Sequence, residues 1–260
     1  MTDPVARKEK DQAKISRKIE RFVSDYVEAS SANGVMIGLS GGLDSSVVAR
    51  LAVNALGPEM VSCLILPASA TPEKDVSDAA NFASSLGMNC TTINIDPIIE
   101  RYAQALPADD RARGNLAARI RMTILYYHAA LKGYLVAGTS DKSERMIGYF
   151  TKFGDGAADI LPIADLYKTE VRALASFLKI PKEIIEKKSS PRLWKDHLAE
   201  QEIGLSYDRM DLILRLLEKK MPPGAIARKL KIPLDEVKKV EALVKKSAHK
   251  RRPAPYARLS

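Results

Sequence analysis

The sequence predicts an α/β fold built on a doubly wound parallel sheet, with helical extensions at the N- and C-terminal ends. Short apolar runs alternate with segments of helical periodicity, as strands and helices do in such sheets. The runs are continuously apolar, which is typical of strands buried on both faces. After about residue 166 no further strand is indicated. Functional residues are therefore expected where the strands end, at the carboxyl edge of the sheet.

The chain is expected to begin with an amphipathic helix within residues 1–30. Its apolar residues recur at a spacing of three to four: Ile15, Ile19, Phe22, Val23, Tyr26 and Val27. That spacing places them on one stripe, which is expected to pack onto the body of the protein.

The α/β core is assigned to residues 31–180. Its four predicted strands are 34–39, 61–66, 90–95 and 134–137, and the helices between them are roughly 44–56, 73–86 and 114–131. A further helix is expected over 169–178. Residues 187–204 lack periodicity and are expected to form a mobile loop, followed by C-terminal helices and a basic tail over 205–260.

Composition narrows the possible partners. The 260 residues are 46% hydrophobic and carry a formal net charge of +9, which favours an anionic partner. No run approaches the roughly 18 apolar residues that a membrane span requires, so no membrane partner and a cytoplasmic location are expected. Cys63 and Cys90 are too few and too isolated to suggest a disulfide framework or a zinc site.

The most informative stretch is Ser40-Gly-Gly-Leu-Asp-Ser-Ser46, which leaves a predicted strand and enters a helix. Its glycines let the backbone approach an anion, and the helix N-terminus offers unpaired N–H groups, which favours a polyphosphate. Asp44 would repel phosphate unless a cation lay between them, so it favours Mg²⁺. A Ser-Gly-Gly turn with a capping aspartate is the alternative.

This stretch lacks the Lys-Ser or Lys-Thr pair of a P-loop and the G-x-G-x-x-G spacing of a dinucleotide site. It resembles the SGGxDS loop of the N-type ATP pyrophosphatases, or PP-loop enzymes, which bind the pyrophosphate of ATP and transfer AMP. The resemblance implies ATP contacts at Gly38, Leu39, Ser40, Gly41, Gly42, Leu43, Asp44 and Ser45. It indicates the type of reaction but not the substrate.

Four further blocks resemble the NAD synthetase family in order and spacing. They are Asn115–Met122, Gly138–Glu144, Gly148–Pro162 and Leu166–Thr169, within a resemblance from about Ile15 to Pro253. It implies a ligase that uses ATP and ammonia to convert deamido-NAD to NAD through an adenylate, with release of AMP and pyrophosphate, as the final step of NAD biosynthesis.

The same resemblance implies roles for individual side chains. Thr139 and Ser190 correspond to ATP contacts, and Lys168 to a cation that neutralises the ATP phosphates and acts in catalysis with Asp44. Glu144 corresponds to a second Mg²⁺ carboxylate beside Asp44. Taken alone, Glu144 and Lys168 are equally consistent with solvated helix charges.

Arg119, Lys152 and Asp159 correspond to family contacts with deamido-NAD. His249-Lys250 corresponds to a tail pair that reaches the substrate in the family's dimer, so a homodimer is implied. Without the resemblance, Arg119 is equally a surface ion pair and the tail a solvated basic end.

One loop departs from the family. Many relatives carry Leu-Trp-x-Gly-Gln-x-Asp-Glu where this chain has Leu193-Trp-Lys-Asp-His-Leu-Ala-Glu200, so no catalytic role is assigned to His197. The segment 187–204 is still expected to be a lid, because a reactive adenylate must be shielded from water.

Other functions remain to be weighed. Pro222–Val237 resembles a helix-turn-helix and precedes the basic tail, which would suit a PP-loop enzyme that modifies tRNA. Its apolar residues Ile226, Leu230 and Ile232 are instead expected to pack inward as a helical hairpin, so nucleic acid is an unlikely partner. A nucleotide sensor without turnover is disfavoured by the complete set of phosphate and metal residues. Glutamine-dependent relatives carry a fused amidohydrolase domain that 260 residues leave no room for, so free ammonia or a separate glutaminase is expected to supply the nitrogen.

Overall fold

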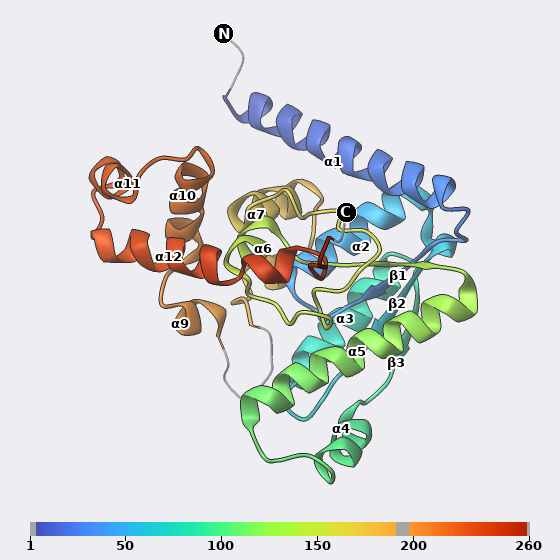
Figure 1. Ribbon diagram of the computed structural model, residues 1–260. Helices are drawn as coiled ribbons and strands as arrows, with labels where there is room; N and C mark the ends of the chain where they lie inside the picture. The colour runs from blue at the N-terminus through green and yellow to red at the C-terminus, as the bar shows by residue number, and fades with distance from the viewer. Residues whose placement is uncertain (1–3, 191–197, 259–260) are drawn as a thin grey trace.

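The computed structural model describes residues 4–190 and 198–258 (Figure 1). A four-stranded parallel sheet has the order β3-β2-β1-β4. The strands are β1 (Val35–Gly38), β2 (Val61–Ile65), β3 (Asn89–Thr92) and β4 (Leu135–Ala137). The helices are α1 (Pro4–Ala29), α2 (Leu43–Leu56), α3 (Glu73–Ser85), α4 (Asp96–Ala103), α5 (Asp110–Lys132), α6 (Lys142–Ile147), α7 (Lys168–Phe177), α8 (Lys182–Ile185), α9 (Ala199–Ile203), α10 (Tyr207–Glu218), α11 (Pro223–Leu230) and α12 (Leu234–Lys246), with short 3₁₀ turns at Pro58–Met60 and Ala248–Arg251.

The predicted doubly wound sheet is confirmed, because neighbouring residues of each central strand belong to separate cores on its two faces. Ile37 of β1 packs with α1, α2, α3 and α7, whereas the adjacent Met36 packs with α4 and α5. This follows from the strand period of two, which sends successive side chains to opposite faces. Both faces of β1 and β2 are thus buried, as their continuous apolar runs indicate.

Strand β3 differs from the expectation. Its residues Asn89–Thr92 are mostly exposed, although the segment from Cys90 was expected to be buried on both faces. The reason is its position at the edge of the sheet, where it pairs only with β2 among the described strands. Its polar residues suit an edge, where an apolar strand would invite pairing with another chain.

Helix α1 packs one stripe against α2 and the body, as predicted. Val23 and Val27 are buried in the core, and Ile15 and Ile19 pack against it. Phe22 and Tyr26, which the spacing assigns to the same stripe, lie at its margin and are each 42% exposed. Figure 1 shows α1 lying over α2, away from the carboxyl ends of the strands.

The C-terminal helices α9 to α12 have a core of their own, beside α6 and α7 (Figure 1). Ile226 and Val237 are fully buried in it, and Leu230 and Ile232 pack against it, so the inward-packed hairpin is confirmed. The short helix α9 falls inside the segment that was expected to be irregular. It forms because Ala199 and Ile203, four residues apart, both pack into this core.

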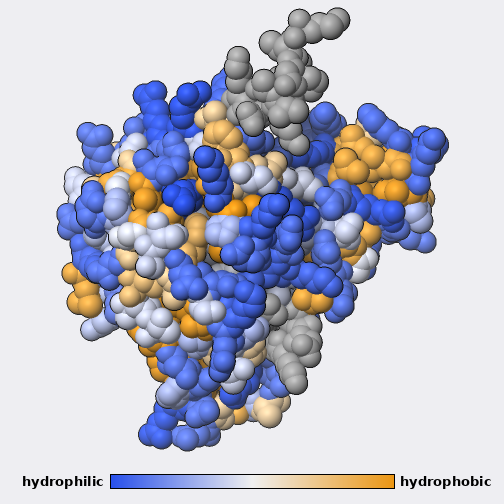
Figure 2. All heavy atoms as spheres, turned by 180° about the vertical axis from the view of Figure 1, so that it is seen from behind, coloured by the Kyte–Doolittle hydropathy of each residue, from blue (hydrophilic) through white to orange (hydrophobic). Residues whose placement is uncertain are grey.

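The surface seen in Figure 2 is mostly hydrophilic, with scattered hydrophobic areas on the body and a compact hydrophobic patch over the C-terminal helices. Exposed apolar side chains of this region include Leu212 on α10, which is 52% exposed. Within the described residues, no helix has both the length and the apolar character needed to cross a bilayer.

Burial at the centre of the core predicts a large effect of truncation there. Leu51 on α2 is 0% exposed, so Leu51→Ala is expected to lower the free energy of unfolding by about 2–5 kcal/mol through lost burial and a cavity. Leu212→Ala, the matched exposed control, should change it by less than about 0.5 kcal/mol. Urea unfolding followed by circular dichroism measures both, and equal losses would contradict this account of the core.

Candidate active site

A cavity of about 440 Å³ opens at the carboxyl edge of the sheet. Its floor includes the ends of three strands, at Gly38, the last residue of β1, at Leu66 after β2 and at Gly138 after β4. Strands β2 and β4 lie on opposite sides of β1, so the strand order reverses direction at β1. Ligands of open α/β sheets bind at such a switch point.

The conformation of the loop between β1 and α2 is fixed by hydrogen bonds between serine hydroxyl groups and its backbone. Ser45 Oγ accepts from the Ser40 backbone N–H at 3.2 Å and donates to the Gly42 carbonyl at 3.2 Å. Ser46 Oγ donates to the same carbonyl at 2.9 Å. Gly42 is the N-cap of α2 and has no side chain to occupy the helix end. The first N–H groups of α2 and their positive dipole therefore face the cavity, an arrangement suited to an anion.

Gly41 is required in this loop for two independent reasons. Its φ of +71° lies in the left-handed region, and a Cβ there would stand 2.2 Å from the Asp75 carbonyl oxygen on α3. The loop is therefore packed against α3 by a contact that only glycine permits.

Three carboxylates surround the ammonium of Lys168 beside this loop. Lys168 Nζ lies 2.6 Å from Asp44 Oδ2, 3.0 Å from Asp141 Oδ2 and 2.8 Å from Glu144 Oε1. The Lys168 side chain is 0% exposed, and the ring centroid of Tyr207 lies 5.0 Å from its ammonium. Asp44, Glu144 and Lys168, predicted from residues far apart in the sequence, are thus brought together in one cluster.

The cluster carries more negative than positive charge in a dry environment. Burial works against the charge of Lys168, but Asp141, Asp44 and Glu144 together raise its pKa well above the ordinary value. Desolvation raises the pKa of Glu144 and of Asp141, even though Lys168 acts in the opposite direction on both. Within the described residues, Asp44 Oδ1 is buried without a hydrogen-bond partner. The site therefore favours a further cation at Asp44 and Glu144.

Asp141 is a site residue that the sequence analysis did not identify. It is 0% exposed and caps α6, with Oδ1 accepting from the Glu144 backbone N–H at 2.8 Å. Its position three residues before Glu144, after a predicted strand, is a capping signal that points to the role. Its second oxygen then reaches Lys168, which no local pattern indicates.

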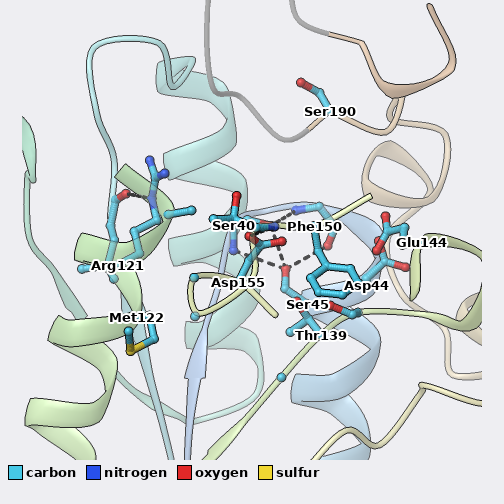
Figure 3. A pocket seen from close by; sticks show the side chains of 18 of the residues that line it. Ser40, Asp44, Ser45, Arg121, Met122, Thr139, Glu144, Phe150, Asp155 and Ser190 are labelled. Atoms are coloured by element: carbon cyan, nitrogen blue, oxygen red, sulfur yellow. Dashed lines mark hydrogen bonds between the residues drawn. The ribbon is translucent and has the colours of Figure 1, made fainter. Parts of the chain in front are cut away.

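The wall opposite the carboxylates belongs to α5, as Figure 3 shows for Arg121 and Met122. Arg121 Nε donates to the Leu66 carbonyl at 2.9 Å, and desolvation lowers the pKa of its guanidinium. Arg119 was predicted to contact deamido-NAD, whereas no role was predicted for Arg121. The helical period indicates that these two side chains point to opposite sides of α5, because residues two positions apart are separated by about 200° around the helix axis.

The cavity brings together most of the residues predicted to contact ATP. Those that line it are Gly38, Leu39, Ser40, Gly42, Leu43, Asp44, Ser45, Thr139 and Ser190. Gly41 and Lys168 support the wall from behind without lining it. In Figure 3, Ser190 lies above the other labelled residues, across the pocket from Thr139.

The residues predicted to contact deamido-NAD lie mostly outside this cavity. Arg119 Nη2 donates to the Lys152 carbonyl at 3.3 Å, and Lys152 Nζ donates to the His249 carbonyl at 3.2 Å, so these three are neighbours on the outer surface. Asp159 is bound by the Val136 backbone N–H at 2.7 Å and by the Tyr126 hydroxyl at 3.2 Å. These contacts place Asp159 between β4 and α5.

Lys250 is the exception, because it lines the cavity. Its ammonium donates to the Gly148 and Phe150 carbonyls at 2.8 Å and 2.7 Å, and desolvation lowers its pKa. Arg251 likewise donates to the Arg145 and Met146 carbonyls at the end of α6. The tail through Arg251 is therefore docked on the α6 region.

The segment expected to form a lid is described at its two ends. Lys187 Nζ lies 2.8 Å from the Gly41 carbonyl, from Asp75 Oδ1 and from Asp78 Oδ2, which ties the start of the segment to the nucleotide loop and α3. Trp194 and His197 lie outside the described residues.

Comparison with known proteins identifies the family. The family model described as NAD synthase matches residues 15–254. An NH(3)-dependent NAD(+) synthetase of Hyperthermus butylicus is 49% identical over 251 residues, covering 94% of this chain and 91% of the relative.

Two solved structures are also similar along their whole length. One is an NMN synthetase from Francisella tularensis, with a TM-score of 0.84, 34% identity, and coverage of 95% of this chain and 98% of that one. The other is an NH3-dependent NAD synthetase from Campylobacter jejuni, with a TM-score of 0.82, 31% identity, and coverage of 95% and 99%. With a family model spanning nearly its full length and relatives of this identity, the chain belongs to the NAD synthase family.

Proposed function

We propose that this protein uses ATP and ammonia to amidate the nicotinate carboxylate of deamido-NAD, giving NAD, AMP and pyrophosphate. The observation that carries the proposal is one cavity that joins an anion-binding loop at the N-terminus of α2 to Asp44 and Glu144, with Lys168 buried behind these two carboxylates. Membership of the NAD synthase family supports it. A cytoplasmic location, expected from the sequence, stays a proposal.

In the first step, an oxygen of the nicotinate carboxylate attacks the α-phosphorus of ATP. A new P–O bond forms, the bond from the α-phosphorus to the bridging oxygen breaks, and pyrophosphate leaves with the electron pair. In this proposal the N–H groups at the start of α2 and the hydroxyls of Ser40 and Ser45, which lie 3.0 Å apart, bind that pyrophosphate. Donors fixed in place before the reaction stabilise the growing negative charge without reorganisation.

In the second step, ammonia attacks the acyl carbon of the adenylate. The C–N bond forms, the bond from the acyl carbon to the AMP oxygen breaks, and the nitrogen loses a proton to give the amide. AMP is a far better leaving group than the original carboxylate oxygen, which is why ATP is consumed. Here the protein acts mainly by positioning the reactants and excluding water.

Asp44 and Glu144 are the residues that would hold Mg²⁺. The buried, unpaired Oδ1 of Asp44 and the excess of negative charge around Lys168 support this assignment. Asp44 and Glu144 supply two carboxylates at the cavity wall, and Mg²⁺ commonly binds one or two carboxylates together with substrate phosphates. When bound, Mg²⁺ would neutralise charge on the ATP phosphates.

The proposed deamido-NAD contacts, Arg119, Lys152, Asp159, His249 and Lys250, favour a homodimer whose interface lies near the substrate. Arg119, Lys152 and His249 are neighbours on the outer surface, and neither they nor Asp159 line the cavity formed by the described residues. Helix α5, which carries Arg119, also exposes large apolar side chains, with Tyr127 65% exposed and Leu131 69% exposed. A second subunit packed here would bury these apolar groups and enclose the substrate.

The family match over residues 15–254 gives no support to the alternative of a tRNA-modifying enzyme. The similarity to an NMN synthetase structure does favour testing a second substrate, nicotinate mononucleotide, which offers the same carboxylate without the adenylate half.

The products distinguish this reaction from ordinary phosphate transfer. With ATP, Mg²⁺, ammonium and deamido-NAD we expect NAD, AMP and pyrophosphate in equal amounts, measured by liquid chromatography. The same assay with nicotinate mononucleotide should be slower, because the interface contacts to the adenylate half are lost. ADP and phosphate as products would contradict the proposal, and a faster reaction with the mononucleotide would reassign the substrate.

Removal of the proposed metal charge has two readouts. Asp44→Asn should lower turnover by about 100-fold or more. It should also weaken Mn²⁺ binding in the presence of a non-hydrolysable ATP analogue, measured by electron paramagnetic resonance without any reaction. Asp165→Asn is the control, since the Asp165 side chain is 99% exposed. Unchanged Mn²⁺ affinity in Asp44→Asn would reject Asp44 as a ligand.

The interface is tested by placing charges on its apolar groups. The double variant Tyr127→Asp/Leu131→Asp is expected to convert a dimer into a monomer in light scattering, because carboxylates would be desolvated on association. Leu212→Asp, a comparably exposed leucine on α10, should leave the dimer intact. A wild-type protein that is monomeric at micromolar concentration would contradict the proposed interface.

A further inference from the structure

Helix α10 belongs to the C-terminal helical core, yet it contacts the active site at two positions. Tyr207 and Asp211 are one turn apart on α10, and both face α6 and α7. Side chains four residues apart lie on the same face of a helix, so α10 presents them as a pair. Neither lines the cavity, and neither carries a role in the proposed reaction.

Asp211 is a buried carboxylate that binds the beginnings of two other helices. It is 1% exposed, and Oδ2 accepts from the Thr169 backbone N–H at 2.9 Å. Oδ1 accepts from the Ser143 hydroxyl at 2.5 Å, and the same hydroxyl oxygen accepts from the Lys168 backbone N–H at 2.9 Å. Asp211 therefore holds the first two N–H groups of α7, one directly and one through Ser143 on α6.

These contacts are adjacent to the charged cluster. Lys168 is the first residue of α7, and Ser143 immediately precedes Glu144 on α6. A shift of either helix start would move Lys168 Nζ or Glu144 Oε1, which are 2.8 Å apart. The contact between α6 and α7 made by Ser143 and Asp211 thus fixes the main chain under both side chains.

Tyr207 acts on the side chains of the same cluster. Its ring centroid is 5.0 Å from Lys168 Nζ, a cation–π contact, and its hydroxyl lies 3.5 Å from Glu144 Oε1. Tyr207 is 0% exposed, so the ring also closes the apolar side of the cluster to water. One helix face therefore supports the backbone of Lys168 and its ammonium together.

We propose that Asp211 is a positioning residue for the reaction, and that through Ser143 and Thr169 it sets the placement of Lys168 and Glu144 against the ATP phosphates. The inference rests on the proposed function for the identity of the reaction. A buried carboxylate without such a purpose would be costly to retain, since desolvated charges stabilise a fold poorly compared with apolar residues of similar size. The C-terminal helices are in this sense part of the active site.

The decisive variant is Asp211→Asn, which keeps the size of the side chain. Its oxygen can still accept from Ser143, but an NH₂ group replaces the oxygen that accepts from Thr169, so two donors face each other. We expect kcat to fall by about 10- to 100-fold, because small misplacements in an active site cost rates of that order. KM for ATP and for deamido-NAD should change by less than about threefold, since the affected groups act mainly in the transition state.

The control is Asp208→Asn on the same helix. Asp208 also faces α7, where its Oδ2 lies 3.7 Å from Arg172 Nη1, but its side chain is 76% exposed. Its kcat should equal that of the wild type, and kcat is compared per folded molecule because Asp211→Asn leaves two buried donors facing each other and is expected to be the less stable variant. A loss of stability in Asp211→Asn with unchanged kcat per folded molecule would overturn the proposal, because it would reveal a purely structural role.

Two further measurements decide the remaining outcomes. If Asp211→Asn does not fold, Ser143→Ala removes the same link through Lys168 N–H, and its kcat must fall at least tenfold or the proposal is wrong. A wild-type protein that makes no NAD refutes the proposed function rather than this inference. The inference is then decided by hydrogen exchange, which must quicken at the start of α7 in Asp211→Asn but not in Asp208→Asn; equal exchange overturns it.

Discussion

The arrangement of this active site depends on one buried ammonium. Lys168 is fully enclosed, and its charge is stabilised only because Asp44, Asp141 and Glu144 reach it from two separate helix starts. A lysine in such a place, without its partners, would lose its proton or unfold its surroundings. The starts of α2, α6 and α7 are therefore fixed relative to one another by electrostatics as much as by packing, and α10 completes the enclosure.

A second constraint acts on the other side of the nucleotide loop. Gly41 lies so close to the Asp75 carbonyl that no larger residue fits, and Lys187 bridges the Gly41 carbonyl to Asp75 and Asp78. The loop thus contacts α3 directly and the start of the 187–204 segment through one ammonium. Lys187, the first residue of that segment, therefore contacts the loop proposed to bind pyrophosphate.

Part of the positive charge of the chain lies on Lys250 and Arg251, which bind backbone carbonyls next to the active site. Lys250 and Arg251 donate to carbonyls of the α6 region that would otherwise need water, and Lys250 also lines the cavity. Cations near the end of a helix are favoured by its dipole. The basic tail, which local sequence alone leaves as a solvated charge run, is in this way part of the wall of the site.

The sequence by itself determined the sheet and the loop. Strand runs such as 61–66 and the helix stripe of α1 follow from periodicity, and the glycines and serines around Asp44 indicate an anion site, because these signals lie within a few neighbouring residues. The exposure of β3 could not be predicted, because it depends on the order of the strands, and that order is set by pairing between segments far apart in the sequence. Only the tertiary structure joined Asp141 and Asp211 to Lys168, brought Arg121 into the cavity and left Arg119 outside. Those placements depend on contacts between helix starts that are far apart in the chain. No local pattern of residues indicates which helix starts will lie side by side.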